Sequence, residues 1–194
     1  MSQAFRELLQ KVGSGPHTSK SLTREEAAMA AAMMLQQEAT PIQIGAFLIA
    51  HRMKRPTGTE LAGMLDAYER LGPKVAAVSS PHPVVVLSVP YDGRSRTAPI
   101  LILTALVLAT CGCPVLMHGG DRMATKYGVP MVELWQALGI DWTHCSLETV
   151  QHTLAQFQLG FVYTPRHFSL LQPLVEARDQ IGKRPPLATL ELLW

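Results

Sequence analysis

The chain has 194 residues, of which 47% are hydrophobic and 16% are charged, and its 17 Lys and Arg against 15 Asp and Glu give a net charge of +2. This length allows one domain or two small ones with a sizeable core, and it excludes a disulfide-stapled mini-protein and a disordered tail. Because soluble domains carry about 25% charged residues, we expect the apolar excess to be covered by a second subunit or by further chain. The small net charge indicates neither a nucleic-acid binder nor a membrane-surface protein, so any basic site must be local.

The three cysteines favour a reducing compartment, because their number is odd and no apolar signal-peptide segment opens the sequence. Two of them are separated by a single glycine, which is too close for a relaxed disulfide, and they lack a matching second pair for zinc. We therefore expect a cytoplasmic protein with reduced, buried, structural cysteines: Cys111, Cys113 and Cys145.

Residues 97–120 contain no Asp, Glu, Lys or Arg and are nominally long enough to span a bilayer. Gly112 and Pro114 interrupt this segment, and they divide it into a buried helix over 98–111 and a short buried strand over 114–118. The segment therefore predicts part of a folded core, and no membrane is expected as a partner.

Residues 1–72 are predicted to be entirely helical. The first segment is amphipathic, with apolar side chains at Phe5, Leu8, Leu9 and Val12, and the glycine-rich stretch 13–16 ends it. Three later helix starts are marked by a threonine with Glu or Gln three residues on, the capping-box pattern: Thr23, Thr40 and Thr57.

Strands and helices are predicted to alternate beyond residue 83. The β-branched run 84–89 favours a strand buried on both faces of a parallel sheet. Further strands are expected over 114–118 and 161–163, and a final buried strand within 187–193. Helices are expected near 98–111, 131–138, 147–157 and 168–180.

The fold class is therefore α/β, with an N-terminal all-helical domain followed by a mainly parallel α/β domain. We place the helical domain at residues 1–72, a linker at 73–83 and the α/β domain at 84–194. Because the sequence stops inside the last apolar run, we expect this α/β domain to be truncated and the chain to be the N-terminal part of a longer protein. The alternative is a genuine short form.

Polar loops follow three of the predicted strands. The carboxyl ends of parallel strands meet at one edge of a sheet, where turns and cationic side chains can hold phosphate. The candidate residues for phosphate or nucleic-acid binding are Tyr91, Asp92, Gly93, Arg94, Ser95, Arg96, His118, Gly119 and Gly120. Arg166 and His167 follow the third strand and form a second basic group. The alternative for each loop is that its arginines are solvated and His118 is a hydrogen-bonded turn residue.

A further basic cluster, separate from these loops, occupies residues 51–55 at the end of a predicted helix. Cations there complement the helix dipole, and contact with a nucleic-acid backbone is the functional alternative. The sequence contains no HExxH, GxSxG, Walker A or paired CxxC motif, which argues against zinc hydrolysis, serine hydrolysis and P-loop chemistry.

Several separated motifs occur in the order found in one enzyme family. Residues 22–27 and above all 39–54, with later matches at 118–119, 136–139 and 178–184, resemble the anthranilate phosphoribosyltransferase family, a relative of the pyrimidine nucleoside phosphorylases. The resemblance implies a helical domain that forms the dimer interface, followed by an α/β domain that is cut about halfway. It also implies that Arg178 matches an arginine that contacts anthranilate, which makes it a candidate for the acceptor or second basic site.

The sequence departs from the family at the phosphate loop. In the enzymes a GTGGDG loop cradles the diphosphate of phosphoribosyl pyrophosphate, and its Asp helps to place Mg²⁺. The corresponding residues 90–95 put Arg94 near that Asp, and a cation repels Mg²⁺. In the family's KHGN motif, Met117 replaces Lys and Gly120 replaces Asn. We therefore expect no metal in this chain, and Mg²⁺ only if transferase activity is retained.

These departures resemble a divergent group of paralogues that bind nucleic acid and lack the transferase activity, because residues 91–94 are similar to that group's Tyr-x-Gly-x-Arg loop. The first hypothesis is a homodimer, joined through its N-terminal helices, that binds single-stranded nucleic acid or a phosphorylated small molecule. The alternative is a pentosyltransferase that joins a phosphorylated ribose donor to a small aromatic or acidic acceptor. A third possibility is a structural or regulatory paralogue that keeps only the dimer fold.

Overall fold

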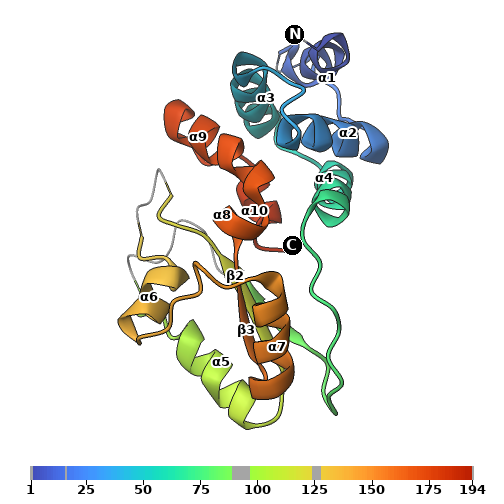
Figure 1. The fold of residues 1–194 in the computed structure, drawn as a ribbon. Coiled ribbons are helices and arrows are strands. Elements are labelled where there is room, and N and C mark those ends of the chain that lie inside the picture. The colour runs from blue at the N-terminus through green and yellow to red at the C-terminus, as the bar shows by residue number, and fades with distance from the viewer. Residues whose placement is uncertain (1, 16, 89–96, 124–127, 194) are drawn as a thin grey trace. The chain divides into compact units, whose positions relative to one another are not determined.

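The computed structural model describes residues 2–15, 17–88, 97–123 and 128–193 (Figure 1). The chain forms two compact units. The helical unit comprises Met1–Gly72 and Leu170–Trp194, and the sheet unit comprises Pro73–Ser169. The sequence assigned residues 170–194 to the α/β domain, and the structure differs because the run expected to be a buried strand forms a short helix, α10 (Leu187–Leu190), that contacts α4.

The helical unit contains α1 (Gln3–Gly13), α2 (Arg24–Leu35), α3 (Pro41–Lys54), α4 (Gly58–Leu71) and, from the end of the chain, α9 (Gln172–Ile181) and α10. All three predicted capping boxes are confirmed: each threonine accepts the N–H of the third helical residue, whose side chain accepts the N–H of the threonine. The apolar side chains between these helices form the core, in which the rings of Phe5 and Phe47 have centroids 5.3 Å apart.

Helices α2 and α4 are in backbone contact at Gly63. A Cβ atom at this position would lie 2.0 Å from the carbonyl oxygen of Arg24, so only a hydrogen atom fits there. Beside this contact, the guanidinium of Arg24 donates to both carboxylate oxygens of Asp66, at 2.6 and 2.8 Å. The two helices are therefore joined by backbone contact and by an ion pair at the surface.

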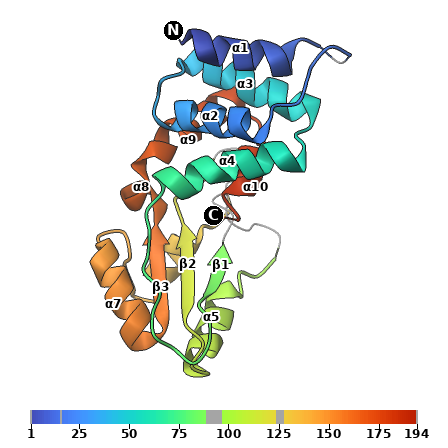
Figure 2. The ribbon, with the colours of Figure 1, turned by 90° about the vertical axis from the view of Figure 1, so that its right-hand side faces the viewer.

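The sheet unit contains three parallel strands in the order β1-β2-β3, namely β1 (Val85–Ser88), β2 (Val115–Gly119) and β3 (Leu159–Tyr163). Figure 2 shows them side by side, with β1 at one side and β3, next to α7, at the other. The helices of this unit are α5 (Leu101–Thr110), α6 (Met131–Ala137), α7 (Leu147–Phe157) and α8 (Thr164–His167), and a 3₁₀ helix (Ser169–Leu171) follows α8. The sheet and these helices bury a core that includes Met117, Trp135, Trp142 and Phe161. The predicted fold class is confirmed.

Two expectations about burial in the sheet unit are wrong. The first predicted strand was expected to be buried on both faces, but β1 pairs only with β2 among the described strands, and Val86 is 56% exposed. The cysteines were expected to be buried, but Cys111 is exposed and Cys113 and Cys145 are half-buried. Cys111 and Cys113 flank Gly112, which has a φ of 80°, so they lie in the turn after α5 and not in the core.

No helix within the described ranges combines the length and the hydropathy needed to cross a membrane.

Candidate phosphate-binding site at the strand ends

The carboxyl ends of the three strands lie at one edge of the sheet. Ser88, the last residue of β1, pairs with His118 of β2, which pairs with Val162 of β3. Because all three strands run in the same direction, the residues that follow them leave the sheet at this edge. The structure therefore brings His118, Gly119 and Gly120 to the same edge as α8. The first candidate loop, residues 91–96, follows β1 in the sequence but lies outside the described residues.

His118 is buried, and burial lowers the pKa of its imidazole from the usual 6.5 to about 4. The ring is therefore neutral near pH 7, when it can donate or accept one hydrogen bond but cannot attract phosphate as a cation. Gly119 follows in the strand, and a Cβ atom there would lie in van der Waals contact with the ring of Phe161, 3.4 Å from its Cζ. Gly120 is also buried.

A hydrogen bond joins the ends of β2 and β3. The hydroxyl of Tyr163 donates to both carboxylate oxygens of Asp121, at 2.9 and 2.8 Å. The pKa of Tyr163 is raised, first by burial and then by the adjacent carboxylate, so the phenol stays protonated and remains a donor. Sequence analysis did not single out Asp121. The register explains the contact, because Gly119, two residues before Asp121, pairs with Tyr163.

The cations near this edge differ in what they contact. Arg122 is bound to Glu133 of α6, with nitrogen–oxygen distances of 2.6 and 2.5 Å. Arg166 of α8 is exposed. Its neighbour His167 is half-buried, and its pKa is lowered by burial and next by the charge of Arg166. At neutral pH the positive charge that α8 presents therefore belongs to Arg166.

Arg178 does not belong to the sheet unit. It lies on α9 in the helical unit, where it is buried and its Nη2 atom donates to both carboxylate oxygens of Glu191 at 2.7 Å. The sequence grouped Arg178 with Arg166 and His167 as a second basic site, but the structure engages its guanidinium in a buried ion pair. This pair ties α9 to the residue that ends α10.

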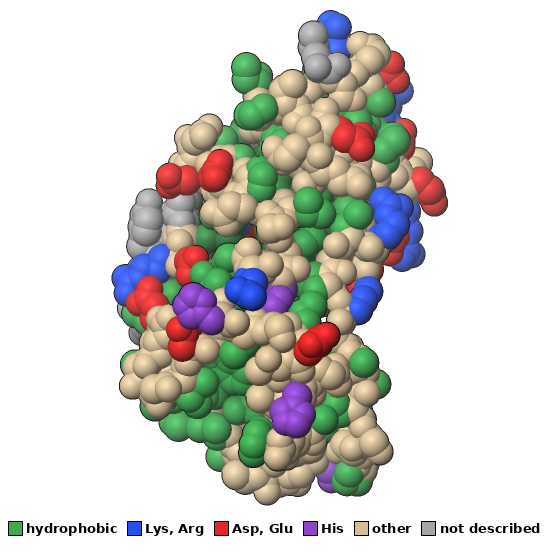
Figure 3. Space-filling view, in the orientation of Figure 1, with side chains coloured by type: hydrophobic (Ala, Val, Ile, Leu, Met, Phe, Trp, Pro, Cys, Tyr) green, Lys and Arg blue, Asp and Glu red, His purple; other side chains and the backbone are tan. Residues whose placement is uncertain are grey.

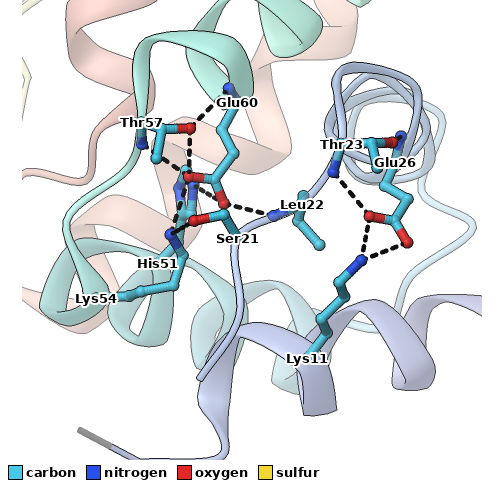
Figure 4. Close-up of polar contacts among 9 residues, drawn as sticks. All are labelled: Lys11, Ser21, Leu22, Thr23, Glu26, His51, Lys54, Thr57 and Glu60. Atoms are coloured by element: carbon cyan, nitrogen blue, oxygen red, sulfur yellow. Dashed lines mark hydrogen bonds and ion pairs between the residues drawn. The ribbon is translucent and has the colours of Figure 1, made fainter. Parts of the chain in front are cut away.

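The basic cluster at the end of α3 is also used inside the helical unit. The buried carboxylate of Glu60 accepts hydrogen bonds from the N–H groups of Leu22 and Thr57, at 2.9 and 2.7 Å, and from Nζ of Lys54 at 2.9 Å (Figure 4). The Nε2 atom of His51 lies 3.7 Å from the same carboxylate. Burial alone would raise the pKa of Glu60, but these donors outweigh it and the pKa is lowered.

The cluster around Glu60 is therefore an internal tie between α3, α4 and the segment before α2. Near the same helix end, the guanidinium of Arg52 donates to the carbonyl of Arg184. These contacts favour the structural interpretation of residues 51–55 over contact with nucleic acid. Among the residues that the structure describes, no three His, Cys, Asp or Glu side chains are grouped so that they could hold a metal ion.

Comparisons with known proteins support the fold and the resemblance. Residues 6–72 match the helical bundle domain of the glycosyl transferase family. The anthranilate phosphoribosyltransferase of Rhodopseudomonas palustris (strain BisA53) is 30% identical over 181 residues, which are 93% of this chain and 50% of that protein. Over most of its length the chain is therefore similar to anthranilate phosphoribosyltransferases. The enzyme of Rhodospirillum rubrum is 29% identical over 167 residues, or 86% of this chain and 46% of its own length.

Solved structures show the same fold. Anthranilate phosphoribosyltransferase from Thermus thermophilus superposes with a TM-score of 0.80 at 20% identity, covering 98% of this chain and 54% of its own. The enzyme from Saccharomyces cerevisiae, in complex with PRPP and Mg, has a TM-score of 0.80 at 18% identity, covering 98% of this chain and 55% of its own. The chain thus spans about half the length of the relatives it matches. Its kinship with the divergent nucleic-acid-binding group stays a prediction.

Proposed function

We propose that this protein binds phosphate-bearing ligands at the carboxyl edge of its sheet, and that the phosphodiester backbone of single-stranded nucleic acid is its preferred ligand. The register of the three parallel strands carries this proposal, because it places the residues after β2 and β3 at one edge of the sheet. Arg94 and Arg96 follow β1 in the sequence. Ligands of open α/β sheets gather at such an edge.

The charges near this edge suit a ligand that is bound without a metal ion. Arg166 is exposed, whereas Arg122 is compensated by Glu133 and Asp121 is held by Tyr163. In the sequence, Arg94 stands near the position of the acidic residue that the enzymes use with Mg²⁺. Arginine forks bind phosphate oxygens directly, so two arginines in this loop can replace a metal-dependent diphosphate cradle.

The decisive experiment is binding of a labelled single-stranded oligonucleotide across a salt series, with EDTA present. The Arg94→Ala/Arg96→Ala variant is expected to bind more weakly and to lower the slope of log K against log[salt] by about 1.4, because each phosphate contact on a single strand contributes ~0.7. Arg6→Ala/Arg70→Ala is the matched control, since it removes two exposed arginines from the helical unit. Absence of binding at low salt would refute the nucleic-acid proposal.

A second candidate function is transfer of a phosphorylated ribose to a small aromatic or acidic acceptor. The similarity to a yeast enzyme solved with PRPP and Mg favours it. Catalysis would then come from positioning the two substrates and stabilising the leaving diphosphate. Consumption of anthranilate with phosphoribosyl pyrophosphate and Mg²⁺, abolished by EDTA, would support this function, and its absence at high protein concentration would remove it.

We also propose that the protein is a cytoplasmic homodimer joined through its N-terminal helices. Two exposed apolar side chains on α3, Ile42 at 86% and Met53 at 76%, support an interface on this unit. Light scattering is expected to give twice the mass of one chain, and Ile42→Glu is expected to lower it. A monomeric mass at a chain concentration of about 100 µM, far above the Kd of a stable dimer, would contradict the proposal.

A further inference from the structure

Two cysteines flank a glycine in the turn between α5 and β2. Cys111 is exposed and Cys113 is half-buried, and neither is in a disulfide. This turn leads into the amino end of β2, at the lower end of the sheet in Figure 2, whereas the candidate phosphate site lies at the carboxyl ends of the strands. The pair is therefore separate from the proposed phosphate site, and nothing in the proposed function uses it.

The turn fixes how far apart the two cysteines lie. The N–H of Gly112 donates to the carbonyl of Ala109, and the N–H of Cys113 donates to the carbonyl of Leu108, both at 3.0 Å. With a φ of 80° at Gly112, these bonds form the Schellman turn that ends many helices. Two residues separated by one other have Cα atoms at most about 7 Å apart in an extended chain, and a turn brings them closer. Because bridged cysteines have Cα atoms about 4.4–6.8 Å apart, both thiols are within reach of one shared atom.

A direct disulfide is the less favourable way to join this pair. Cysteines separated by one residue close a small ring, in which the S–S bond cannot take its relaxed geometry. An atom placed between the two sulfurs lengthens the bridge by one bond and relieves that strain. The pair therefore suits an element that binds two thiols at once.

The number of ligands argues against the metals that thiolates commonly bind. Structural zinc takes four protein ligands, but within the described ranges no third His, Cys, Asp or Glu joins these two cysteines as a metal-ligand set. Cu(I) accepts two thiolates, but the complex then has a net negative charge. The partial negative charge at the C-terminal end of α5 opposes such a complex. A ligand whose complex with two thiolates is neutral fits this position better.

The surroundings of the turn also favour a neutral complex. The hydroxyl of Ser80 donates to the carbonyl of Gly112 at 3.4 Å, and the N–H of Val115 donates to the carbonyl of Gln158 at 2.8 Å. The three segments that these bonds join contain no Asp, Glu, Lys or Arg: residues 75–88, 97–120 and 149–165. In Figure 3 the lower end of the sheet unit shows hydrophobic and His side chains but none of these four types. No charged side chain of these segments is therefore present to balance an ionic complex.

We propose that Cys111 and Cys113 form a dithiol site for trivalent arsenicals of the form R–As(OH)2, where R is a group that the arsenic keeps. The two thiols displace the two hydroxyl groups. Two As–S bonds replace two As–O bonds, and the thiol protons leave with the hydroxyl groups as two molecules of water. Arsenic stays trivalent, so the step requires no oxidant or reductant, and the product is neutral. The site does not depend on the proposed phosphate ligand.

The test titrates the full chain with phenylarsine oxide, which hydrates to the dihydroxide in water, after reduction with a phosphine that is then removed. Intact-mass measurement is expected to show one phenylarsenic group bound per chain, with two thiol hydrogens lost. The second thiol of the turn acts at an effective concentration of about 1 mM or more, so Cys111→Ser and Cys113→Ser are each expected to weaken binding by at least about 100-fold. The dithiol 2,3-dimercaptopropanol is expected to release the arsenic, whereas glutathione at the same thiol concentration is not.

The third cysteine supplies the matched control. Cys145→Ser removes a half-buried cysteine just before α7 and is expected to leave both the affinity and the stoichiometry unchanged. The circular dichroism of all three variants is expected to match that of the original chain. Absence of binding at a few equivalents would overturn the proposal. An affinity that neither Cys111→Ser nor Cys113→Ser lowers would overturn it in favour of capture by a single thiol, and an equal loss in Cys145→Ser would overturn the assignment to this turn.

Discussion

The helical unit and the sheet unit differ in what they bury and what they expose. The helical unit buries charge: Glu60 is held against Lys54 and His51, and Arg178 is held against Glu191. The sheet unit exposes apolar surface on α5 and an open edge on β1. A buried ion pair that keeps both partners is an internal tie, and an exposed apolar face is a site of association. The buried charges thus tie the helical unit internally, whereas the sheet unit presents apolar side chains of α5 at its surface.

The largest effect is expected for Glu60→Ala. It leaves the N–H groups of Leu22 and Thr57 and the ammonium of Lys54 without their common acceptor, and breaking such a buried pair costs about 3–5 kcal/mol. Urea unfolding measures the loss, and Glu176→Ala, at an exposed position of the same unit, is the control, expected within about 0.5 kcal/mol of the original chain. A loss below about 1 kcal/mol for Glu60→Ala would show that this buried charge does not stabilise the helical unit, and the contrast between the two units would then be wrong.

The ion pair of Arg178 and Glu191 is tested by a double-mutant cycle. Arg178→Met and Glu191→Leu are each expected to cost about 3 kcal/mol, because each removes the ion-pair partner of a buried charge. The double variant is expected to be more stable than the sum of the two losses predicts, by about 2 kcal/mol. Additive losses would show that the two side chains act separately and that α10 is held by its apolar residues.

Acid is expected to weaken both units through their buried histidines. Burial is the main cause that lowers the pKa of His51 and of His118 to about 4, whereas an unfolded histidine titrates near 6.5. The unfolded chain therefore binds more protons between these values, so stability is complete above about pH 6.5 and is lost as the pH falls toward about 4. Unfolding midpoints in urea between about pH 7.5 and about pH 4.5 measure the loss. His118→Leu is expected to flatten the pH dependence, and an unchanged profile would contradict a neutral, buried His118.

The smallest effect is expected at the helix caps, which both units share. Thr40→Ala removes the oxygen that accepts the N–H of Gln43 and is expected to cost about 1 kcal/mol. Thr40→Ser keeps that oxygen and is expected to retain most of the stability. Equal losses in the two variants, measured by urea unfolding, would assign the effect to the methyl group and not to the cap.

Local chemistry explains which parts of the fold were predictable. The capping boxes and the helix over 147–157 depend on residues within one turn or one face, and the structure has them as predicted. The prediction of a strand within 187–193 was wrong because a short apolar run is compatible with a buried strand or with a buried helix. The prediction that β1 is buried on both faces was wrong because burial depends on which elements lie beside the strand. The residues of the strand alone do not specify those neighbours.

The candidate site likewise has one part that the sequence predicted and one part that it did not. That the strand ends converge followed from the parallel pattern, and the register of His118 with Ser88 and Val162 agrees with it. The partners of the charged side chains did not follow, because Tyr163 meets Asp121 across 42 residues and Arg178 meets Glu191 across a turn and a new helix. Such pairs depend on tertiary packing, which a single sequence does not display.

The contact at Gly63 limits how the helical unit can change in evolution. Any side chain there would collide with the backbone carbonyl of Arg24, and a backbone atom cannot rotate away as a side-chain tip can. Room for a Cβ atom would require the N-terminal end of α2 to move away from α4, and other side chains would have to fill the space that this movement opens. A substitution at this position therefore requires a shift of the backbone, whereas a substitution at an exposed position of the same helices does not.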